Sequence, residues 1–279
     1  MSELRKLQLV ELDILKEFIK VCDKLNLKYY LDSGTLLGCI RHEGFIPWDD
    51  DIDIGMFRED YDVFIQKGQE FLPEGLFIQT YKTDKEYVQA FAKIRNSNTT
   101  FIETSAKNQK INHGVYIDIF PFDNYAKEKK ITNFIDHKKD ILYNIQLNKK
   151  YFLNHLGKPK GFKVRITKAI SELFFKNKPI YDLLEKKVQL ATKYDKRDCE
   201  FVKCYFYSTT INTIFHKSIF GNGVKKRFED IYVNVPEKYD EYLKTMYGDY
   251  MKLPPEEKRI AHHYNEKIDL KKSYNEYIN

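Results

Sequence analysis

The sequence predicts an α+β protein. Apolar residues recur at helical spacing over residues 4–25 and again over 126–195, and short apolar runs typical of strands lie between them. The strands are grouped and do not alternate regularly with helices, so we expect a mixed sheet with an inserted or appended helical subdomain. No internal repeat or low-complexity linker interrupts the 279 residues.

The N-terminal part is expected to alternate between helices and strands. A helix over 4–25 precedes a short apolar strand over 27–31, and Asp32 with the next three residues has the composition of a helix start. Gly44 and Pro47 break this second helix before the acidic strand that includes residues 51–54. The next helix covers 58–71 and ends at Pro73 and Gly75.

Four strand-like runs follow, at 76–81, 87–94, 99–103 and 115–120, the last ended by Pro121. Helical periodicity then marks 131–145 and 162–173, strands return near 201–206 and 228–233, and Pro236 opens a last helix that Gly248 closes. We therefore divide the chain into a catalytic core (1–125), a basic helical subdomain (126–200), and C-terminal strands and a helix that complete the core (201–279).

The charge is unevenly distributed. The whole chain has a formal charge of 47 − 41 = +6, but residues 126–180 hold 14 Lys/Arg and 4 Asp/Glu, a net of +10. Such a block favours an anionic partner such as a membrane surface, a phosphorylated polymer or a nucleic acid. The helices in this block carry Lys on one side and Ile or Phe on the other, a pattern that suits either anionic lipid or solvent.

The four cysteines show no CxxC spacing, which indicates reduced thiols of a cytoplasmic protein. No run approaches the ~18 apolar residues that a membrane-spanning helix needs. The N-terminus is not a signal peptide. We expect a soluble protein or one that lies peripherally on the inner face of the cell membrane.

The run from Trp48 to Gly55 is the strongest chemical signal, because four aspartates occupy five positions. Asp51 and Asp53 alternate with Ile52 and Ile54, so one face of a strand is acidic and the other apolar. Like charges this close favour a divalent cation, Mg²⁺ or Mn²⁺, held by carboxylate oxygens. A calcium loop of the EF-hand type is excluded, because its sixth position would be Ile54 and its twelfth Asp60.

A third carboxylate, Asp118, lies in an apolar strand, where an unpaired charge would be costly. Asp118 would complete a metal site with Asp51 and Asp53, although a strand-end Asp near Pro121 can also cap a turn. Gly34 and Thr35 offer backbone N–H groups and a hydroxyl at a helix N-terminus, where phosphate binds well. An ordinary N-cap explains them equally.

Four cations lie near these carboxylates in the sequence: Arg41, His42, Lys93 and Arg95. Lys93 and Arg95 are two apart on a strand, so they share a face, which is either part of a phosphate site or exposed to solvent. A further cluster, Lys258, Arg259, His262 and His263, lies near the C-terminus. Its histidines lack a second pair of ligands for zinc.

Residues 34–54, GTLLGCIRHEGFIPWDDDIDI, resemble the signature of the LicD family of phosphotransferases. Further matches are Phe91–Arg95, Ile117–Pro121 and the tail from Tyr247 to His263, so the resemblance covers nearly the whole chain except 126–200. The family is similar to the polymerase-β-type nucleotidyltransferases. It implies a mixed-sheet core in which a Gly-Ser or Gly-Thr turn, an Asp-x-Asp strand and a third Asp surround the metal.

The resemblance implies transfer of phosphocholine, or a related alcohol phosphate, from a CDP-linked donor such as CDP-choline. The acceptor would be a glycan or lipid-linked glycan, such as a precursor of teichoic acid or lipopolysaccharide, and no nucleic acid is expected. Asp51, Asp53 and Asp118 are then the catalytic and metal-binding residues. The implied substrate contacts are Gly34, Thr35, Arg41, His42, Trp48, Lys93 and Arg95.

Two other functions stay open at this point. A metal-dependent glycosyltransferase also uses an Asp-x-Asp strand, and a noncatalytic glycan- or lipid-binding protein could retain a degenerate site. The donor alcohol is not readable from the sequence, because the aromatic cage that a quaternary ammonium needs cannot be picked out among 21 Tyr and 20 Phe.

Overall fold

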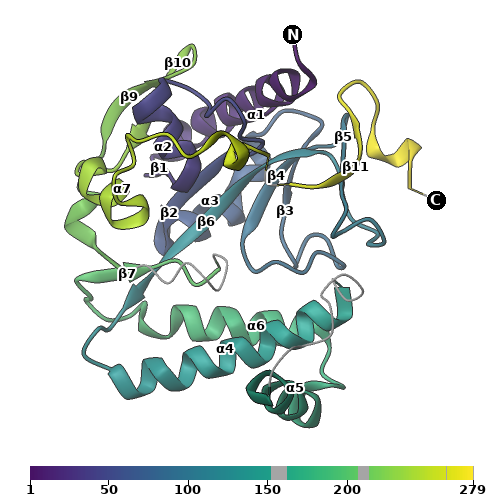
Figure 1. The fold of residues 1–279 in the computed structure, drawn as a ribbon, viewed down its shortest axis with the longest axis vertical. Coiled ribbons are helices and arrows are strands. Elements are labelled where there is room, and N and C mark those ends of the chain that lie inside the picture. Colours follow the sequence, from purple (N-terminus) through teal and green to yellow (C-terminus); the bar gives the residue numbers. More distant parts are fainter. Residues whose placement is uncertain (152–161, 207–213, 262, 279) are drawn as a thin grey trace.

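The computed structural model describes residues 1–151, 162–206, 214–261 and 263–278, and it has the expected α+β architecture (Figure 1). The helices are α1 (Glu3–Leu25), α2 (Ser33–His42), α3 (Arg58–Lys67), α4 (Lys130–Tyr151), α5 (Phe162–Phe175), α6 (Ile180–Ala191) and α7 (Tyr239–Tyr247). The strands are β1 (Tyr30–Leu31), β2 (Asp53–Phe57), β3 (Leu76–Gln79), β4 (Ala92–Asn96), β5 (Thr100–Glu103), β6 (Val115–Tyr125), β7 (Phe201–Lys203), β8 (Ile214–His216), β9 (Val224–Phe228), β10 (Ile231–Val235) and β11 (Asn265–Asp269).

A seven-stranded mixed sheet forms the centre, in the order β1-β2-β6-β4-β3, with β7 and β8 added beyond β6. Only the β2–β6 pair is parallel among the described pairs of this sheet; the others are antiparallel. The long strand β6 pairs with both β2 and β4, so residues from three neighbouring strands meet along it.

Helices α1 and α3 cover one face of the sheet. Ser2 caps the start of α1 by accepting a hydrogen bond from the Arg5 N–H, and Asn26 ends it in the left-handed conformation. Phe18 of α1 lies edge-on to Phe64 of α3, with ring centroids 5.2 Å apart. Ile52 and Ile54 are fully buried in the same core, which confirms the predicted apolar face of the acidic segment.

Two predicted strand boundaries need correction. The strand expected at 87–94 begins only at Ala92, and β6 continues through Pro121 to Tyr125. The Asp118 N–H donates to the Ile52 carbonyl, directly before β2, so the nitrogen of Pro121 faces the opposite side of β6. There the pairing with β4 ends at Ile119 and the pairing with β7 starts at Asp123, so no ladder bond is lost.

The C-terminal region also differs from expectation. The strand predicted at 228–233 is a hairpin, β9 and β10, whose turn contains Glu229 in the left-handed conformation. The strand expected at 99–103 pairs with β11 in a separate two-stranded sheet, and neither β11 nor β8 was predicted. Short strands of this kind depend on their pairing partners more than on local sequence.

Helices α4, α5 and α6 lie together at one end of the molecule (Figure 1). Periodicity predicted α4 and α5 and extended across α6 without marking it as a separate helix. Tyr143, Leu147 and Leu183 pack in a cluster of their own that also includes Tyr81 and Ala90. The division of the chain at 125 and 200 stays a prediction.

Among the described residues, no helix combines the length and apolar character required to cross a bilayer. The four cysteines are buried free thiols, as expected from their spacing: Cys22, Cys39, Cys199 and Cys204.

Candidate active site

The register of three strands builds a polar row across the centre of the sheet. Asp53 of β2 lies opposite Asp118 of β6, and Asp118 lies opposite Lys93 of β4. Directly opposed residues point to the same face of a sheet. The Lys93 ammonium is accordingly 2.7 Å from the Asp118 carboxylate. The third predicted carboxylate, Asp51, precedes β2 by two residues and is not itself in the strand.

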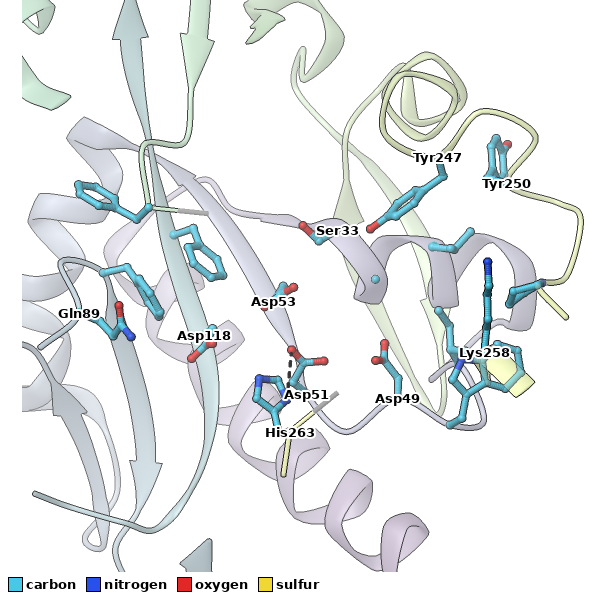
Figure 2. A pocket seen from close by; sticks show the side chains of 18 of the residues that line it. Ser33, Asp49, Asp51, Asp53, Gln89, Asp118, Tyr247, Tyr250, Lys258 and His263 are labelled. Atoms are coloured by element: carbon cyan, nitrogen blue, oxygen red, sulfur yellow. Dashed lines mark ion pairs between the residues drawn. The ribbon is translucent and has the colours of Figure 1, made fainter. Parts of the chain in front are cut away.

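These carboxylates line one cavity of about 950 Å³ (Figure 2). Asp51, Asp53 and Asp118 lie near its middle, and Asp49 adds a fourth carboxylate from the loop before β2. The predicted catalytic set therefore meets in one place, with more negative charge than the sequence analysis assigned to it.

Helix α2 holds the acidic segment in place. The Thr35 hydroxyl accepts a hydrogen bond of 2.8 Å from the Asp53 N–H, so Thr35 acts behind the cavity wall. Gly34 does line the cavity, and a Cβ there would come within 3.0 Å of an Asp49 carboxylate oxygen. Ser33, the first residue of the helix, has a positive φ of 45°, a strained conformation for a residue other than Gly, Asn or Asp.

The N-terminal helix also reaches this segment. The Gln8 side chain of α1 donates to the Asp49 carbonyl at 2.8 Å. Glu11, on the same helix, is buried, and burial followed by the charges of Asp51 and Asp50 raises the pKa of its carboxyl well above the ordinary value. Glu11 was missed by the sequence analysis, because a single Glu on an amphipathic helix gives no signal.

Burial and mutual repulsion shift the carboxyl groups in one direction. Burial and then the neighbouring carboxylates Asp51 and Asp50 raise the pKa of Asp49 to about 8. Burial, Asp51 and Asp118 raise the pKa of Asp53 well above its ordinary value. Burial also raises the pKa of Asp118, although Lys93 opposes that shift. The cavity thus carries a concentration of negative charge that protein cations only partly offset.

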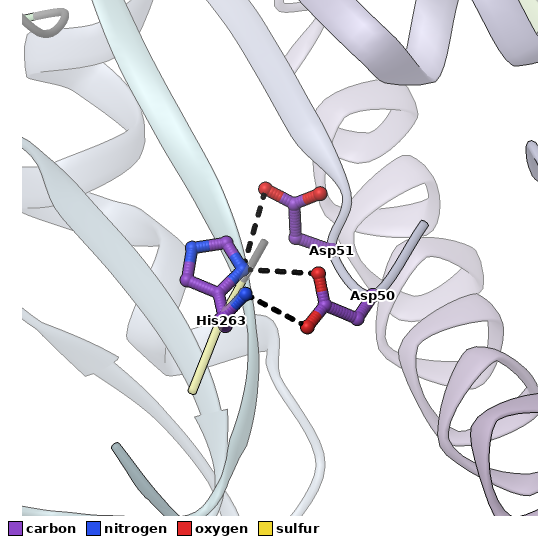
Figure 3. Close-up of side chains that lie close together, drawn as sticks. All are labelled: Asp50, Asp51 and His263. Carbon is purple, nitrogen blue, oxygen red and sulfur yellow. Dashed lines mark hydrogen bonds and ion pairs between the residues drawn. The ribbon is translucent and has the colours of Figure 1, made fainter. Parts of the chain in front are cut away.

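His263, from the segment before β11, lies beside Asp50 and Asp51 of the acidic loop (Figure 3). Its Nδ1 is 3.2 Å from one Asp50 carboxylate oxygen and 4.0 Å from Asp51, and its backbone N–H donates to Asp50 at 3.0 Å. Burial lowers the pKa of His263, but Asp50 and Asp51 outweigh burial and raise it to about 9. The predicted C-terminal cluster therefore contributes His263 to the site, more than 200 residues away in sequence.

The side chains best arranged to hold a metal ion together include this histidine. Within the described residues, the one group of three whose donor atoms all lie within 4.8 Å of one another is Asp50, Asp51 and His263. The predicted trio of Asp51, Asp53 and Asp118 is not a second group of this kind among the described residues. Asp50, which the sequence analysis did not include among metal ligands, belongs in the candidate set.

The predicted substrate-binding residues separate into two groups. Arg41 and Trp48 line the cavity, as Gly34 does. The Arg41 guanidinium donates to the Tyr250 carbonyl at 2.7 Å, and burial lowers the pKa of Arg41 from its ordinary value. His42 lies outside the cavity lining, edge-on to the Trp48 ring, and burial followed by the charge of Arg41 lowers its pKa.

Lys93 and Arg95 are both buried, so the expected alternative of a solvent-exposed face is wrong. Lys93 reaches the site only through Asp118, and its ammonium lies 3.4 Å from the centre of the Tyr116 ring. Arg95 is outside the cavity lining and donates to Gln79 and to the Gly114 carbonyl at 2.8 and 2.9 Å. These contacts give Arg95 a structural role.

Further cavity residues come from regions that the sequence analysis had not assigned to substrate. The C-terminal segment supplies Tyr247, Tyr250, Lys252 and Lys258, and the helical block supplies Asn144, Leu147 and Lys187. Burial, followed by the carboxylates Asp32 and Asp53, raises the pKa of Tyr247. The sequence analysis named Lys258 in the C-terminal cationic cluster and gave the other six residues no role.

Residues 26–153 match the model of the family described as LicD/FKTN/FKRP, nucleotidyltransferase domain. The chain is similar to the lipopolysaccharide cholinephosphotransferase LicD of Haemophilus influenzae, with 33% identity over 267 residues, which are 94% of this chain and 97% of that protein. It is also similar to the human ribitol 5-phosphate transferase FKRP, with 26% identity over 125 residues, 44% of this chain and 22% of that protein. Because the similarity to the Haemophilus protein extends over nearly the whole of both chains, this chain belongs to the LicD family.

Proposed function

We propose that this protein transfers an alcohol phosphate, phosphocholine or a related group, from a CDP-linked donor to a hydroxyl of a cell-surface glycan or teichoic acid precursor, with release of CMP. The observation that carries the proposal is that Asp49, Asp51, Asp53 and Asp118 line one cavity, with Lys93 paired to Asp118 behind it. The names of the relatives, a cholinephosphotransferase and a ribitol 5-phosphate transferase, support this substrate class.

The donor set fits a divalent cation. Hard carboxylate oxygens crowd into a buried space, where burial and then mutual repulsion raise their pKa values, and a Mg²⁺ or Mn²⁺ ion would relieve both. We propose Asp51, Asp53 and Asp118 as its ligands, with Asp50 and His263 next to them. When bound, such an ion supplies charge stabilisation to phosphate oxygens.

The chain's own residues then bind and orient the substrates. The N-terminus of α2 at Gly34 offers backbone N–H groups to a donor phosphate, and Arg41 and Lys258 of the cavity lining offer positive charge. We assign to Asp118 the acceptance of the proton from the attacking hydroxyl, and to Lys93, whose ammonium is 2.7 Å away, the orientation of that carboxylate. In-line attack at the phosphorus that bears the alcohol leaves CMP.

By extension, we propose that the mixed sheet with α2 at its edge is a polymerase-β-like core. The supports are the helix N-terminus at Gly34, adjacent to Asp53, and the parallel strands that carry Asp53 and Asp118. Location at the cytoplasmic side of the cell envelope is part of the same proposal.

The direct test is a donor screen. CDP-choline, CDP-glycerol and CDP-ribitol are each incubated with the protein, Mg²⁺ or Mn²⁺ and an acceptor glycan, and CMP is measured. We expect CMP release with one of them and its loss in EDTA. A parallel reaction contains a nucleotide-sugar as donor. Transfer of its sugar, with no CMP from any CDP-alcohol, would favour a glycosyltransferase. Calorimetry that shows no metal-linked affinity for any CDP-alcohol would favour a noncatalytic binding protein.

A further inference from the structure

Exposed apolar side chains concentrate on the helical block α4–α6. Of the fifteen large hydrophobic residues exposed in the described chain, eight lie between residues 131 and 181. Scattered exposed hydrophobics are ordinary on a protein surface, but a concentration of this kind marks an interaction surface.

Helix α4 carries two apolar stripes on different sides. Tyr143 and Leu147 are buried against the rest of the molecule, whereas Ile131, Phe134 and Ile135 are 78%, 62% and 46% exposed. The exposed residues have the spacing i, i+3, i+4, which places them on one face of the helix. The inner stripe completes the core, and the exposed stripe takes no part in it.

Helix α5 also has an apolar outer face. Ser171 faces inward, where its hydroxyl donates to the Leu142 carbonyl and accepts from the Gln146 side chain at 2.8 and 2.9 Å. Its outer face presents Ile166, Ile170, Leu173 and Phe174, which are 44%, 40%, 78% and 63% exposed. Phe175 packs inward against Tyr143, with ring centroids 5.1 Å apart, so the inner face of α5 is already joined to α4 while these four apolar residues stay exposed. An outer helix face of this composition suits an apolar phase on that side.

The surrounding charge identifies that phase. Residues 126–180 carry a net charge of +10, and lysines 129, 130, 138, 139 and 176 are exposed. The Lys138 ammonium lies 5.1 Å from the centre of the exposed Phe134 ring, so a cation and an apolar group share the same surface. A second copy of the chain would bring an equal positive charge to this face, whereas anionic lipid offers both opposite charge and an apolar layer.

We propose that the outer faces of α4 and α5 form a docking surface for an anionic membrane, on which the protein lies without crossing it. The inner side of α4 contributes Asn144 and Leu147 to the cavity, so docking on the outer side brings the candidate active site close to the membrane surface. The helical block therefore joins two tasks, closing the cavity and holding it beside lipid. The proposal concerns lipid binding and does not depend on the reaction proposed above.

The test is co-sedimentation of the full chain with vesicles of phosphatidylcholine alone and of phosphatidylcholine with 25–30% phosphatidylglycerol. We expect binding to the anionic vesicles that weakens as salt rises. The triple variant Ile131→Gln, Phe134→Gln, Leu173→Gln is expected to lower the partition coefficient at least about tenfold. Tyr232→Gln, on the β9–β10 hairpin and 69% exposed, is the matched control that retains binding.

Circular dichroism and thermal melting of the triple variant establish that it is folded, since all three positions are exposed and outside the cavity. Release of CMP from a water-soluble donor and acceptor is expected to stay at the wild-type level in this variant. Equal binding of wild type and triple variant, or equal binding to neutral and anionic vesicles, overturns the proposal. A wild-type dimer that the triple variant dissociates also overturns it, in favour of a self-association surface.

Discussion

Strand β6 carries two buried aspartates, Asp118 and Asp123, in contrasting surroundings. Asp123 is fully buried and accepts two hydrogen bonds from the Arg58 guanidinium, at 2.7 and 3.2 Å. Asp118 has one ammonium, that of Lys93, and opens onto a cavity that contains other aspartates. The Asp123–Arg58 pair is enclosed and its charges balance. The Asp118–Lys93 pair belongs to a group with excess negative charge.

The difference separates structure from function. Burial raises the pKa of Asp123 to about 6, and the charge of Arg58 opposes that shift and keeps the carboxylate paired. In the cavity, the largest influence on Asp49 and Asp53 after burial is another carboxylate, which adds to the shift. Such repulsion does not stabilise the fold, which is why the proposed function rests on the cavity carboxylates and not on the Asp123–Arg58 pair.

The largest expected effect follows from removing one cavity carboxylate. Asp51→Asn should lower kcat for CMP release about 10³-fold, because the charge that would hold the metal and phosphate is lost. Thermal stability should be unchanged or higher, since a like-charged neighbour has been removed. Steady-state kinetics and melting curves measure both. The control is Asp230→Asn, an exposed carboxylate on the β9–β10 turn; retention of full metal-dependent turnover by Asp51→Asn would exclude the proposed site.

The reverse pattern is expected at the matched pair. Asp123→Asn leaves the Arg58 guanidinium without its main partner in a buried position and should lower the free energy of unfolding by about 3–5 kcal/mol. Urea denaturation gives this value, and activity per folded molecule should be unaffected. The double variant Arg58→Met, Asp123→Leu should be less destabilised than Asp123→Asn. A loss of kcat without a loss of stability would show that Asp123 acts in the reaction, and the contrast between Asp123 and Asp118 would then be wrong.

A smaller effect is expected at Thr35, which belongs to the supporting structure but holds a carboxylate residue of the cavity. Thr35 accepts the Asp53 N–H at 2.8 Å, so Thr35→Val should displace Asp53 and lower kcat/KM about tenfold, or about 1.4 kcal/mol. Thr35→Ser retains the hydroxyl and should restore most of the activity. If the phosphate contact implied by the family resemblance were the main role, Thr35→Val would chiefly raise KM for the donor and leave kcat unchanged.

The sequence predicted the fold class and the larger elements because their signals are local. Alternation of Ile52 and Ile54 with aspartates, and the helical spacing in 4–25, both reflect burial along a single element. The passage of β6 through Pro121 was missed, because it depends on a gap between two partner strands. The short strands β8 and β11 likewise require partners that are distant in the chain.

The candidate site could be predicted only in part for the same reason. Asp53 and Asp118 were paired correctly, since both lie in apolar strands where a lone carboxylate is costly. His263 reaches Asp50 from more than 200 residues away, and no spacing rule connects them. Arg95 has the same strand face as Lys93, yet only the packing of Tyr116 and Gln79 reveals that it is enclosed away from the cavity.

The smallest effect concerns a matched pair at the surface, between α1 and the β9–β10 turn. The Arg5 guanidinium donates to both Glu229 carboxylate oxygens, at 2.5 and 3.0 Å. Burial raises the pKa of Glu229, but the hydrogen bonds from Arg5 and from the Phe45 N–H outweigh it, so the pKa lies below its ordinary value of 4.5. The folded state therefore releases this proton more readily than the unfolded state does.

It follows that the pair stabilises the fold above about pH 4.5, and that this contribution is lost as the pH falls through the lower pKa of the folded state. Glu229→Gln should lower the free energy of unfolding by about 1 kcal/mol at pH 7, discounted for partial exposure, and by progressively less in acid. Melting temperatures at pH 7, 5 and 4 measure the difference from wild type. Glu43→Gln, an exposed carboxylate 3.6 Å from Arg227, is the control with a smaller effect. A difference that grew in acid would mean that Glu229 resembles the strained carboxylates of the cavity and not the matched ones.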